Sequence, residues 1–310
     1  MQLSGQILVV GPVFMDSIYA ELPQMPELGK EVYGKEHALA VGGMAITAIG
    51  IARLGWPVSL ATAVGTDFFG DILIQTLKRE GVGCGYVQPL KGQFTNSTTA
   101  IVHGGDRAFV SYSGAELAES KLVGQANLAD PDIRHIHLSL REDPKIGGIL
   151  QTAKERKITT SLVTGWDGVE LYATMPEQLK AFLVKTDLFF CNELEAKHLS
   201  GQEDLHRAME FFSELGCHPI ISMGAQGAIT FDEDGTIIQA IPPEIEFLDP
   251  TGAGDSLSAG CMVGRMMGWD WQKTLQLGVV CGSLSTRALG GITAFPKNLS
   301  DALSYFPEHR

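Results

Sequence analysis

The sequence predicts an α/β protein with a mostly parallel central sheet, helices on both faces of that sheet, and a smaller antiparallel sheet. The first observation is that short apolar runs alternate with stretches of helical length and pattern, which is typical of βαβ units. The second is that these runs are continuously apolar, as strands buried on both faces are. The third is that two stretches of the chain interrupt this rhythm.

The first elements illustrate the pattern. Residues Ile7–Gly11 form a short apolar run that ends in glycine, as a buried strand does. Ile46, Ile49 and Leu54 lie among small residues and indicate a helix over 43–54, which a glycine then ends. The later elements are strand 58–64, helix 69–79, strand 134–138, helix 145–156, strand 160–163, strand 188–191, helix 205–215 and strand 219–222.

The two interrupting stretches predict a separate, smaller sheet. Residues Glu31–Ala40 are more polar than the predicted strands. Thr98–His103 and Arg107–Tyr112 are strand-like runs joined by Gly104-Gly105-Asp106, and glycine pairs of this kind suit hairpin turns. The sequence therefore predicts a small antiparallel sheet that stands apart from the main one.

Charge and apolar run length exclude some partners. The 310 residues include 23 basic and 36 acidic side chains, for a net charge of −13. Nucleic acids and anionic membranes bind basic surfaces, so we expect neither as the main partner. The longest apolar runs are far shorter than the ~20 residues that span a bilayer, so we expect no membrane association.

The cysteines and the N-terminal residues indicate a cellular compartment. Five cysteines are scattered without CxxC spacing, and we interpret them as free thiols in a reducing environment. Residues Met1–Val10 lack the basic segment and the small-residue cleavage site of a secretory signal. We therefore expect a cytoplasmic protein.

The stretch Asp249-Pro250-Thr251-Gly252-Ala253-Gly254-Asp255 is the most informative part of the chain. An apolar run follows it, so it reads as a tight turn at the start of a buried helix. The first N–H groups of a helix lack intrahelical partners and favour anions. Asp255 repels an anion, so we interpret it as a base that takes a proton from an attacking hydroxyl beside an anion hole. The alternative is a glycine-rich turn between two aspartates.

Further candidates follow predicted strand ends, where parallel sheets bind ligands. Asp16 could accept hydrogen bonds from substrate hydroxyls or be a solvated turn residue, and Glu142, after another predicted strand, has the character of a surface acid. Gly42-Gly43 lets the backbone approach a substrate before the first helix. Asn192 and Glu195 offer the hard oxygen ligands that suit Mg²⁺, usually through water, although a helix cap has the same spacing. Ser222–Gly227 has two glycines that permit backbone contact with a nucleotide, or forms an ordinary hairpin.

These motifs, in this order, resemble the ribokinase family of PfkB-type carbohydrate kinases from Gly11 to about Pro296. The resemblance implies a three-layer α/β/α fold with an antiparallel β lid, in a single kinase domain over 1–310 with lid segments at about 12–40 and 96–114. By similarity, Asp255 is the catalytic base and Gly252, Ala253 and Gly254 form the anion hole. It also implies a sugar-like substrate and a homodimer that forms through the lid.

The resemblance assigns the other candidates to ligands. The implied substrate-binding residues are Asp16, Gly42, Gly43, Glu142 and Asp255. The implied nucleotide-binding residues are Asn192, Ser222, Gly224, Gly227 and Gly254. Asn192 and Glu195 would organise Mg²⁺ with ATP, and Asp249 with the segment 285–291 would form a monovalent-cation site for an ion such as K⁺.

One departure from the family pattern concerns the acceptor. The substrate-binding asparagine of the family falls at Ile46, with Thr47 beside it, and isoleucine cannot hydrogen-bond a hydroxyl. The sequence thus predicts an ATP-dependent kinase that phosphorylates a hydroxymethyl group of a sugar or sugar-like molecule. The alternatives are a nucleoside, a sugar phosphate or a vitamin-type alcohol as acceptor, or a catalytically silent sugar-binding regulator.

Overall fold

A nine-stranded sheet runs through the centre of the chain in the computed structural model, which describes residues 5–307 except 105, 127, 129, 144 and 174. The strand order is β13-β12-β11-β10-β9-β8-β1-β4-β5. All neighbours from β11 to β5 are parallel, whereas β12 and β13 pair antiparallel at one edge. The strands of this sheet are β1 (Gln6–Val10), β4 (Val58–Gly65), β5 (Gly83–Leu90), β8 (Ile133–Ser139), β9 (Thr159–Val163), β10 (Leu188–Asn192), β11 (His218–Ser222), β12 (Ala228–Phe231) and β13 (Ile237–Ala240).

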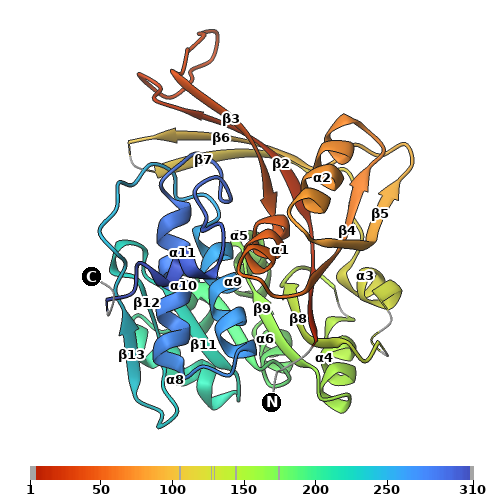
Figure 1. Cartoon of the computed structure of the whole chain (residues 1–310), viewed down its shortest axis with the longest axis vertical. Helices are drawn as coiled ribbons and strands as arrows, with labels where there is room; N and C mark the ends of the chain where they lie inside the picture. Colours follow the sequence, from red (N-terminus) through yellow and green to blue (C-terminus); the bar gives the residue numbers. More distant parts are fainter. Residues whose placement is uncertain are drawn as a thin grey trace.

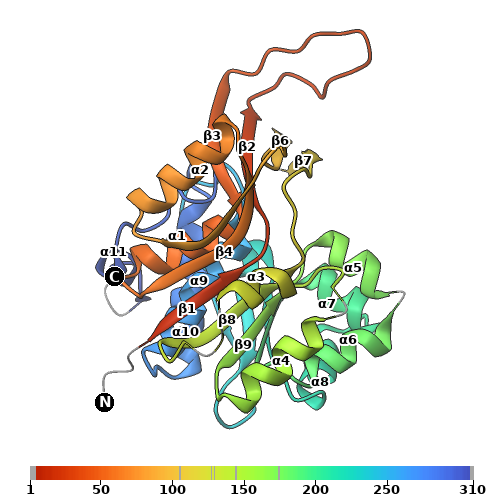
Figure 2. The ribbon, with the colours of Figure 1, turned by 90° about the vertical axis from the view of Figure 1, so that its right-hand side faces the viewer.

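Helices cover both faces of the sheet, which makes three layers (Figures 1 and 2). Each face has its own apolar core, one built with α1, α2, α9, α10 and α11 and the other with α3 to α8. The helices are α1 (Met44–Arg53), α2 (Phe68–Arg79), α3 (Glu119–Ala126), α4 (Ile146–Glu155), α5 (Trp166–Ala173), α6 (Pro176–Leu183), α7 (Glu193–Ser200), α8 (Leu205–Glu214), α9 (Ala253–Met266), α10 (Trp271–Ser285) and α11 (Leu299–Leu303). The three-layer α/β/α architecture and the largely parallel sheet predicted from the sequence are confirmed.

Short polar side chains begin several of the helices. Asp67, Asn192, Asp204, Asp270 and Asn298 each accept a hydrogen bond from a backbone N–H of the first turn that follows. These caps satisfy donors that a helix start leaves without a partner. The α9 helix differs, because its N-cap is Gly252 and no side chain caps it.

A second sheet of four strands stands apart from the main one (Figure 2). Its order is β3-β2-β6-β7, with β2 (Val13–Ala20), β3 (Glu36–Gly43), β6 (Ser97–His103) and β7 (Asp106–Tyr112). The pairs β2/β3 and β6/β7 are antiparallel, and a parallel β2/β6 pairing joins them. The predicted hairpin over 98–112 is therefore confirmed, except for Gly105, which lies outside the described residues. We call this the lid sheet.

The lid sheet has an inner and an outer face. Ile18 and Ala100 are buried on the inner face and pack with Leu289 of the main body. Because strand residues alternate between faces, Asp16 shares the inner face with Ile18, and its partners Thr98 and then Ser111 continue the same row. The lid sheet therefore presents the Asp16 row to the body.

The connection between β2 and β3 extends beyond the body as an arm without regular secondary structure, residues 21–35 (Figure 2). The side chain of Leu28 in this arm is fully exposed. Lys30 forms an ion pair with Glu27 at 2.6 Å, and both side chains are mostly exposed. The arm therefore makes its local contacts away from the main core.

Two general expectations can be compared with the described residues. None of their helices is both long and apolar enough to cross a membrane. All five cysteines are free thiols, four of them buried: Cys191, Cys217, Cys261 and Cys281.

Candidate active site

The turn that begins α9 is held by close packing beneath Gly252. This residue has φ +76°, in the left-handed region that favours glycine, and a Cβ there would lie 2.6 Å from Ile46 Cδ1. A Cβ on Gly291 would meet the same Ile46 atom at 2.8 Å. Ile46 is thus buried under the turn, and its packing against Gly252 and Gly291 accounts for an isoleucine at this position.

The first turn of α9 leaves a backbone donor for a ligand. The N–H of Ala253 donates to Pro250 O at 3.2 Å, and that of Ser256 donates to Gly252 O at 2.9 Å. Among the described residues, no backbone carbonyl accepts from the N–H of Gly254. Gly254 is exposed, and a Cβ there would meet nothing within 4 Å. The turn therefore has the unpartnered N–H, the open approach and the helix dipole that favour an anion.

Asp255 lies one residue further into α9 and contacts α1. Its Oδ1 accepts a hydrogen bond from Thr47 Oγ1 at 3.2 Å. Burial raises the pKa of Asp255 to about 6, and the Thr47 hydroxyl opposes this rise. A carboxylate with a pKa near 6 is a stronger base than an ordinary aspartate and is still largely ionised at neutral pH.

Asp16 lies on β2, within the lid sheet, and is 6% exposed. Its pKa is raised to about 7, first by burial and then by the negative charges of Asp255 and Asp249. Gly42 lies beside it, because a Cβ on Gly42 would collide with the Asp16 carboxylate. Gly43 follows as the N-cap of α1. The structure thus brings together Asp16, Gly42 and Asp255, which the sequence placed far apart.

Asp249 is fully buried and fixes two chain segments. Its Oδ1 accepts from Thr251 N and its Oδ2 from Gly290 N, both at 2.9 Å. Thr286 O accepts from Asp249 N at 3.0 Å, which ties the same segments together again. The Thr251 hydroxyl is buried without a hydrogen-bond partner. This hydroxyl and the Asp249 carboxylate belong to the same turn, where a monovalent-cation site stays a prediction.

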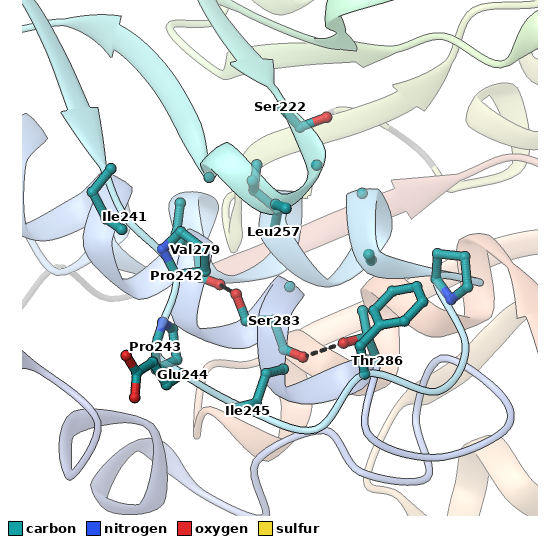
Figure 3. A pocket seen from close by; sticks show the side chains of 18 residues that line it. Ser222, Ile241, Pro242, Pro243, Glu244, Ile245, Leu257, Val279, Ser283 and Thr286 are labelled. Atoms are coloured by element: carbon teal, nitrogen blue, oxygen red, sulfur yellow. Dashed lines mark hydrogen bonds between the residues drawn. The ribbon is translucent and has the colours of Figure 1, made fainter. Parts of the chain in front are cut away.

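A cavity of about 500 Å³ opens beside the Gly254 turn (Figure 3). Its wall is mainly apolar, and Ser283 and Thr286 bond the α10 backbone, donating to Val279 O and Ser283 O at 2.7 Å. The lining residues come from the β11–β12 turn, the segment 241–250, α9 and α10. The segment 241–250 contributes one wall, which includes Ile241, Pro242, Pro243, Glu244, Ile245 and Phe247. A mainly apolar cavity whose lining includes Gly254 suits a nucleotide base and its phosphates.

Ser222, Gly224 and Gly227 lie where the chain turns from β11 to β12, and all three line this cavity. A short 3₁₀ turn spans Gly224–Gln226, and the two strands pair antiparallel. Gly227 has φ +85°, and a Cβ there would collide with Ala240 O. The segment is therefore a hairpin that also forms a wall of the cavity, and its contact with a nucleotide stays a prediction.

Asn192 and Glu195 form a capping box at the start of α7. Asn192 Oδ1 accepts from Glu195 N at 2.9 Å, and Glu195 Oε2 accepts from Asn192 N at 2.8 Å. Asn192 also lines a second cavity of about 300 Å³, which shares Ser222 and Gly224 with the first. No group of three or more His, Cys, Asp or Glu among the described residues could hold a metal ion. Glu195 lines neither cavity, so Asn192 is the member of this pair that borders the space beside Ser222 and Gly224.

Glu142 is not brought to this group of residues. It follows β8 and is exposed, and the contacts of the described residues do not connect it with Asp16 or Asp255. Sequence reasoning, in turn, gave no role to Thr47 or to the wall at 241–247. The Thr47 contact spans 208 residues, and the wall has no regular secondary structure, so neither has a local sequence signal.

Comparisons with known proteins show the family and the fold of the chain. The pfkB family of carbohydrate kinases matches residues 5–298. The chain is 27% identical to a ribokinase of Lactococcus lactis, over 94% of each protein, and 25% identical to a cytidine kinase of Thermococcus kodakarensis, over 88% of this chain and 93% of that one. The chain also superimposes on a crystal structure described as a ribokinase II from E. coli in complex with ATP and Mg²⁺. The TM-score is 0.81 at 24% identity, over 98% of this chain and 100% of that chain. The chain belongs to the pfkB family of carbohydrate kinases.

Proposed function

We propose that this protein is an ATP-dependent kinase that transfers the γ-phosphoryl group to a hydroxymethyl group of a sugar or sugar-like molecule. Family membership makes it a phosphotransferase with an alcohol acceptor. The observation that carries the finer proposal is that Asp16 of the lid sheet and Asp255 of α9 are electrostatically coupled beside the Gly252–Gly254 turn. An acceptor between the two carboxylates would meet a binding group and a base at once.

In the proposed reaction, Asp255 acts as the general base. The acceptor O–H proton moves to the Asp255 carboxylate while the acceptor oxygen bonds to the γ-phosphorus and the bond to the ADP oxygen breaks. The N–H of Gly254, at the positive end of α9, would stabilise negative charge on the transferring group. The small residues Gly252 and Ala253 keep the approach to this donor free of long side chains.

ATP would occupy the 500 Å³ cavity, with its base between the wall at 241–247 and α10, and with its phosphates directed to Gly254. Ser222, Gly224 and Gly227 would contact it from the β11–β12 turn. Asn192 and Glu195 would hold Mg²⁺ through water, and the ion would neutralise phosphate charge. The Asp249 corner, with its unpartnered Thr251 hydroxyl, would hold a monovalent cation such as K⁺.

The acceptor would lie under the lid sheet. Asp16 would bind its hydroxyls, and Gly42 and Gly43 would allow the backbone to approach it, since a side chain at Gly42 would displace the Asp16 carboxylate. Glu142 is exposed and would reach the acceptor only if the lid sheet and body close on it. Closure would also exclude water from the phosphoryl group.

A nucleoside acceptor is the second candidate, and Phe109 favours it. Phe109 pairs with Ala100, so it shares the inner face with Asp16, and its ring is about half exposed. An aromatic ring on this face could stack on a base. We expect Phe109→Ala to lower kcat/KM for cytidine more than for D-ribose, whereas equal losses would argue against stacking.

A silent sugar-binding regulator is disfavoured, because Asp255, with its raised pKa, and the adjacent unpartnered N–H of Gly254 are both present. The direct test is ADP formation with ATP and Mg²⁺, measured against a panel of sugars, nucleosides, sugar phosphates and vitamin-type alcohols. Phosphorylation of one sugar or nucleoside well above the acceptor-free rate supports the proposal. Binding of a sugar without ADP formation would support the regulator instead.

We also propose a homodimer that forms through the outer face of the lid sheet. Leu39 and Val110 are 56% and 72% exposed, and they lie in one row across Ser17 and Thr99, opposite the Asp16 face. A second copy would bury these side chains, since exposed apolar rows mark interaction sites. Leu39→Lys with Val110→Lys should give a monomer by light scattering, whereas Phe68→Lys, at an exposed site on α2, should not. A wild-type monomer would contradict the dimer.

We infer a cytoplasmic location for the chain. The four buried free thiols fit a reducing compartment, because such an environment keeps thiols unpaired.

A further inference from the structure

The side chain of Thr47 crosses from α1 to the base on α9. Thr47 is fully buried in the interior of α1. A threonine inside a helix often bonds the carbonyl of the preceding turn. Here its hydroxyl instead lies 3.2 Å from Asp255 Oδ1 and 3.5 Å from Asp255 O. One hydroxyl therefore touches both the carboxylate and the main chain of the same residue.

Close packing fixes the position of Thr47 relative to α9. A Cβ on Gly50, one turn further along α1, would lie 2.9 Å from the Cβ of Ala259 in α9. At the other side, Ile46 fills the space under Gly252. The two helices are therefore closely packed on either side of Thr47, which restricts where its hydroxyl can lie relative to Asp255.

Thr47 is the one side chain, among the described residues, that hydrogen-bonds Asp255. The contact engages Oδ1, which leaves Oδ2 for an acceptor hydroxyl. A hydrogen bond to the charged form of a carboxylate favours that form, and Thr47 accordingly lowers the pKa of Asp255 against the effect of burial. The contact thus acts on both the orientation and the ionisation of this group.

We propose that Thr47 is a positioning residue for catalysis. It holds the ionised Asp255 carboxylate through Oδ1, so that Oδ2 faces the acceptor hydroxyl. The proposal rests on the proposed role of Asp255 as the base. It assigns a catalytic consequence to the residue that follows Ile46, the position where the substrate-binding asparagine of the family falls. The acceptor itself need not touch Thr47.

Thr47→Val tests this proposal, because valine keeps the shape and removes the hydroxyl. The assay measures ADP released with D-ribose or cytidine, whichever gives the higher wild-type rate, from pH 5 to 9. A hydrogen bond to a charged group corresponds to roughly a 10-fold effect or more, so kcat should fall by about that factor with KM for ATP little changed. The acid limb of kcat/KM should move to higher pH, because the base loses a contact that favours ionisation.

Two further variants separate this role from a structural one. Thr47→Ser keeps the hydroxyl and should restore both the rate and the acid limb. Thr62→Val is the matched control, since Thr62 is also fully buried and its hydroxyl has no partner, so neither property should change. If Thr47→Val fails to fold, Thr47→Ala removes the same hydroxyl without adding atoms, and the same changes are expected of it.

The outcomes distinguish a failure of the Thr47 proposal from a failure of the proposed role of Asp255 as the base. If folded Thr47→Val has wild-type kcat and an unmoved acid limb while Asp255→Asn is inactive, Thr47 has no positioning role and the base assignment stands. If Asp255→Asn turns over normally, the base assignment fails and the Thr47 proposal fails with it. A lower rate and a shifted limb, both restored by serine, support the proposal.

Discussion

Asp16 and Asp255 lie near opposite ends of the sequence, yet the charge of Asp255 helps raise the pKa of Asp16 to about 7. Asp255 itself has a pKa of about 6. The negative charge of Asp255 disfavours ionisation of Asp16, so Asp16, which has the higher pKa, takes up the first proton as the pH falls. Between these two values, the site holds a protonated Asp16 and an ionised Asp255.

This relationship predicts the acid limb of activity. Asp255 must be ionised to accept the acceptor proton, so kcat/KM should fall as the pH drops through about 6. The protonation of Asp16, near pH 7, should change acceptor binding and appear in KM for the acceptor. The measurement is a pH–rate profile from pH 5 to 9 with saturating ATP. A profile that stays flat down to pH 5 would contradict the role of Asp255.

Asp16→Asn should raise stability while it weakens acceptor binding. A carboxyl whose pKa is raised in the folded state contributes stability below its unfolded pKa and loses that contribution as the pH rises through about 7. Asparagine removes the resulting cost of a buried charge, so Tm should rise by about 2 °C or more at pH 8, and by less at pH 5. Thermal melts of the free protein at both pH values measure this; a lower Tm at pH 8 would argue against a destabilising charge.

Two glycines of the anion turn should respond differently to alanine. Gly252→Ala places a Cβ against Ile46 at a left-handed φ, so it should cost roughly 1–3 kcal/mol of stability. Gly254→Ala meets no protein atom within 4 Å and lies within α9, so the fold should be retained. Its methyl group would occupy the approach to the backbone donor, and kcat should fall by 10-fold or more. Melts and turnover of both variants check this; full activity of Gly254→Ala would contradict the anion hole.

A pair of buried histidines should make the fold sensitive to acid. His135 Nε2 and His137 Nδ1 both lie 2.7 Å from Ser161 Oγ, and burial lowers both pKa values to about 3. A lowered histidine pKa contributes stability above the unfolded value, near 6.5, and this contribution is lost as the pH falls towards 3. His137→Phe removes one of these groups together with its unpartnered Nε2. The fall in Tm between pH 7 and pH 5 should be smaller in this variant than in wild type; an equal fall would exclude His137 as a cause.

The sequence predicted most of the central architecture, because buried strands and helices have local periodic patterns. The edge strand β5 was not predicted, since Gly83, Gly85 and Pro89 read as turn residues although an edge position tolerates them. The helices α3, α5 and α6 are short, and their pattern is correspondingly weak. The lengths of these elements and the register of the strands therefore depend on tertiary packing, for which the sequence carries little local signal.

The candidate site also contains residues that the sequence could predict and residues that it could not. The Gly252–Asp255 turn could be predicted, because its residues are contiguous and their chemistry is distinctive. Thr47 could not, since its partner lies 208 residues away and threonine within a helix is unremarkable by itself. The sequence indicated only that Ile46 lacks the hydrogen-bonding group of an asparagine. The structure adds that this isoleucine packs beneath Gly252 and supports the turn. The roles of Asn192, Glu195 and Glu142 stay predictions.

The central claim is that Asp255 is the base that removes the acceptor proton, and Asp255→Asn tests it most directly. Asparagine keeps the size of the side chain and can still meet Thr47 but cannot accept the proton. The account predicts an unchanged affinity for ATP by calorimetry, a retained fold, and a kcat lowered by roughly 10²–10⁴. A variant that binds ATP and phosphorylates the acceptor at close to the wild-type rate would contradict the account.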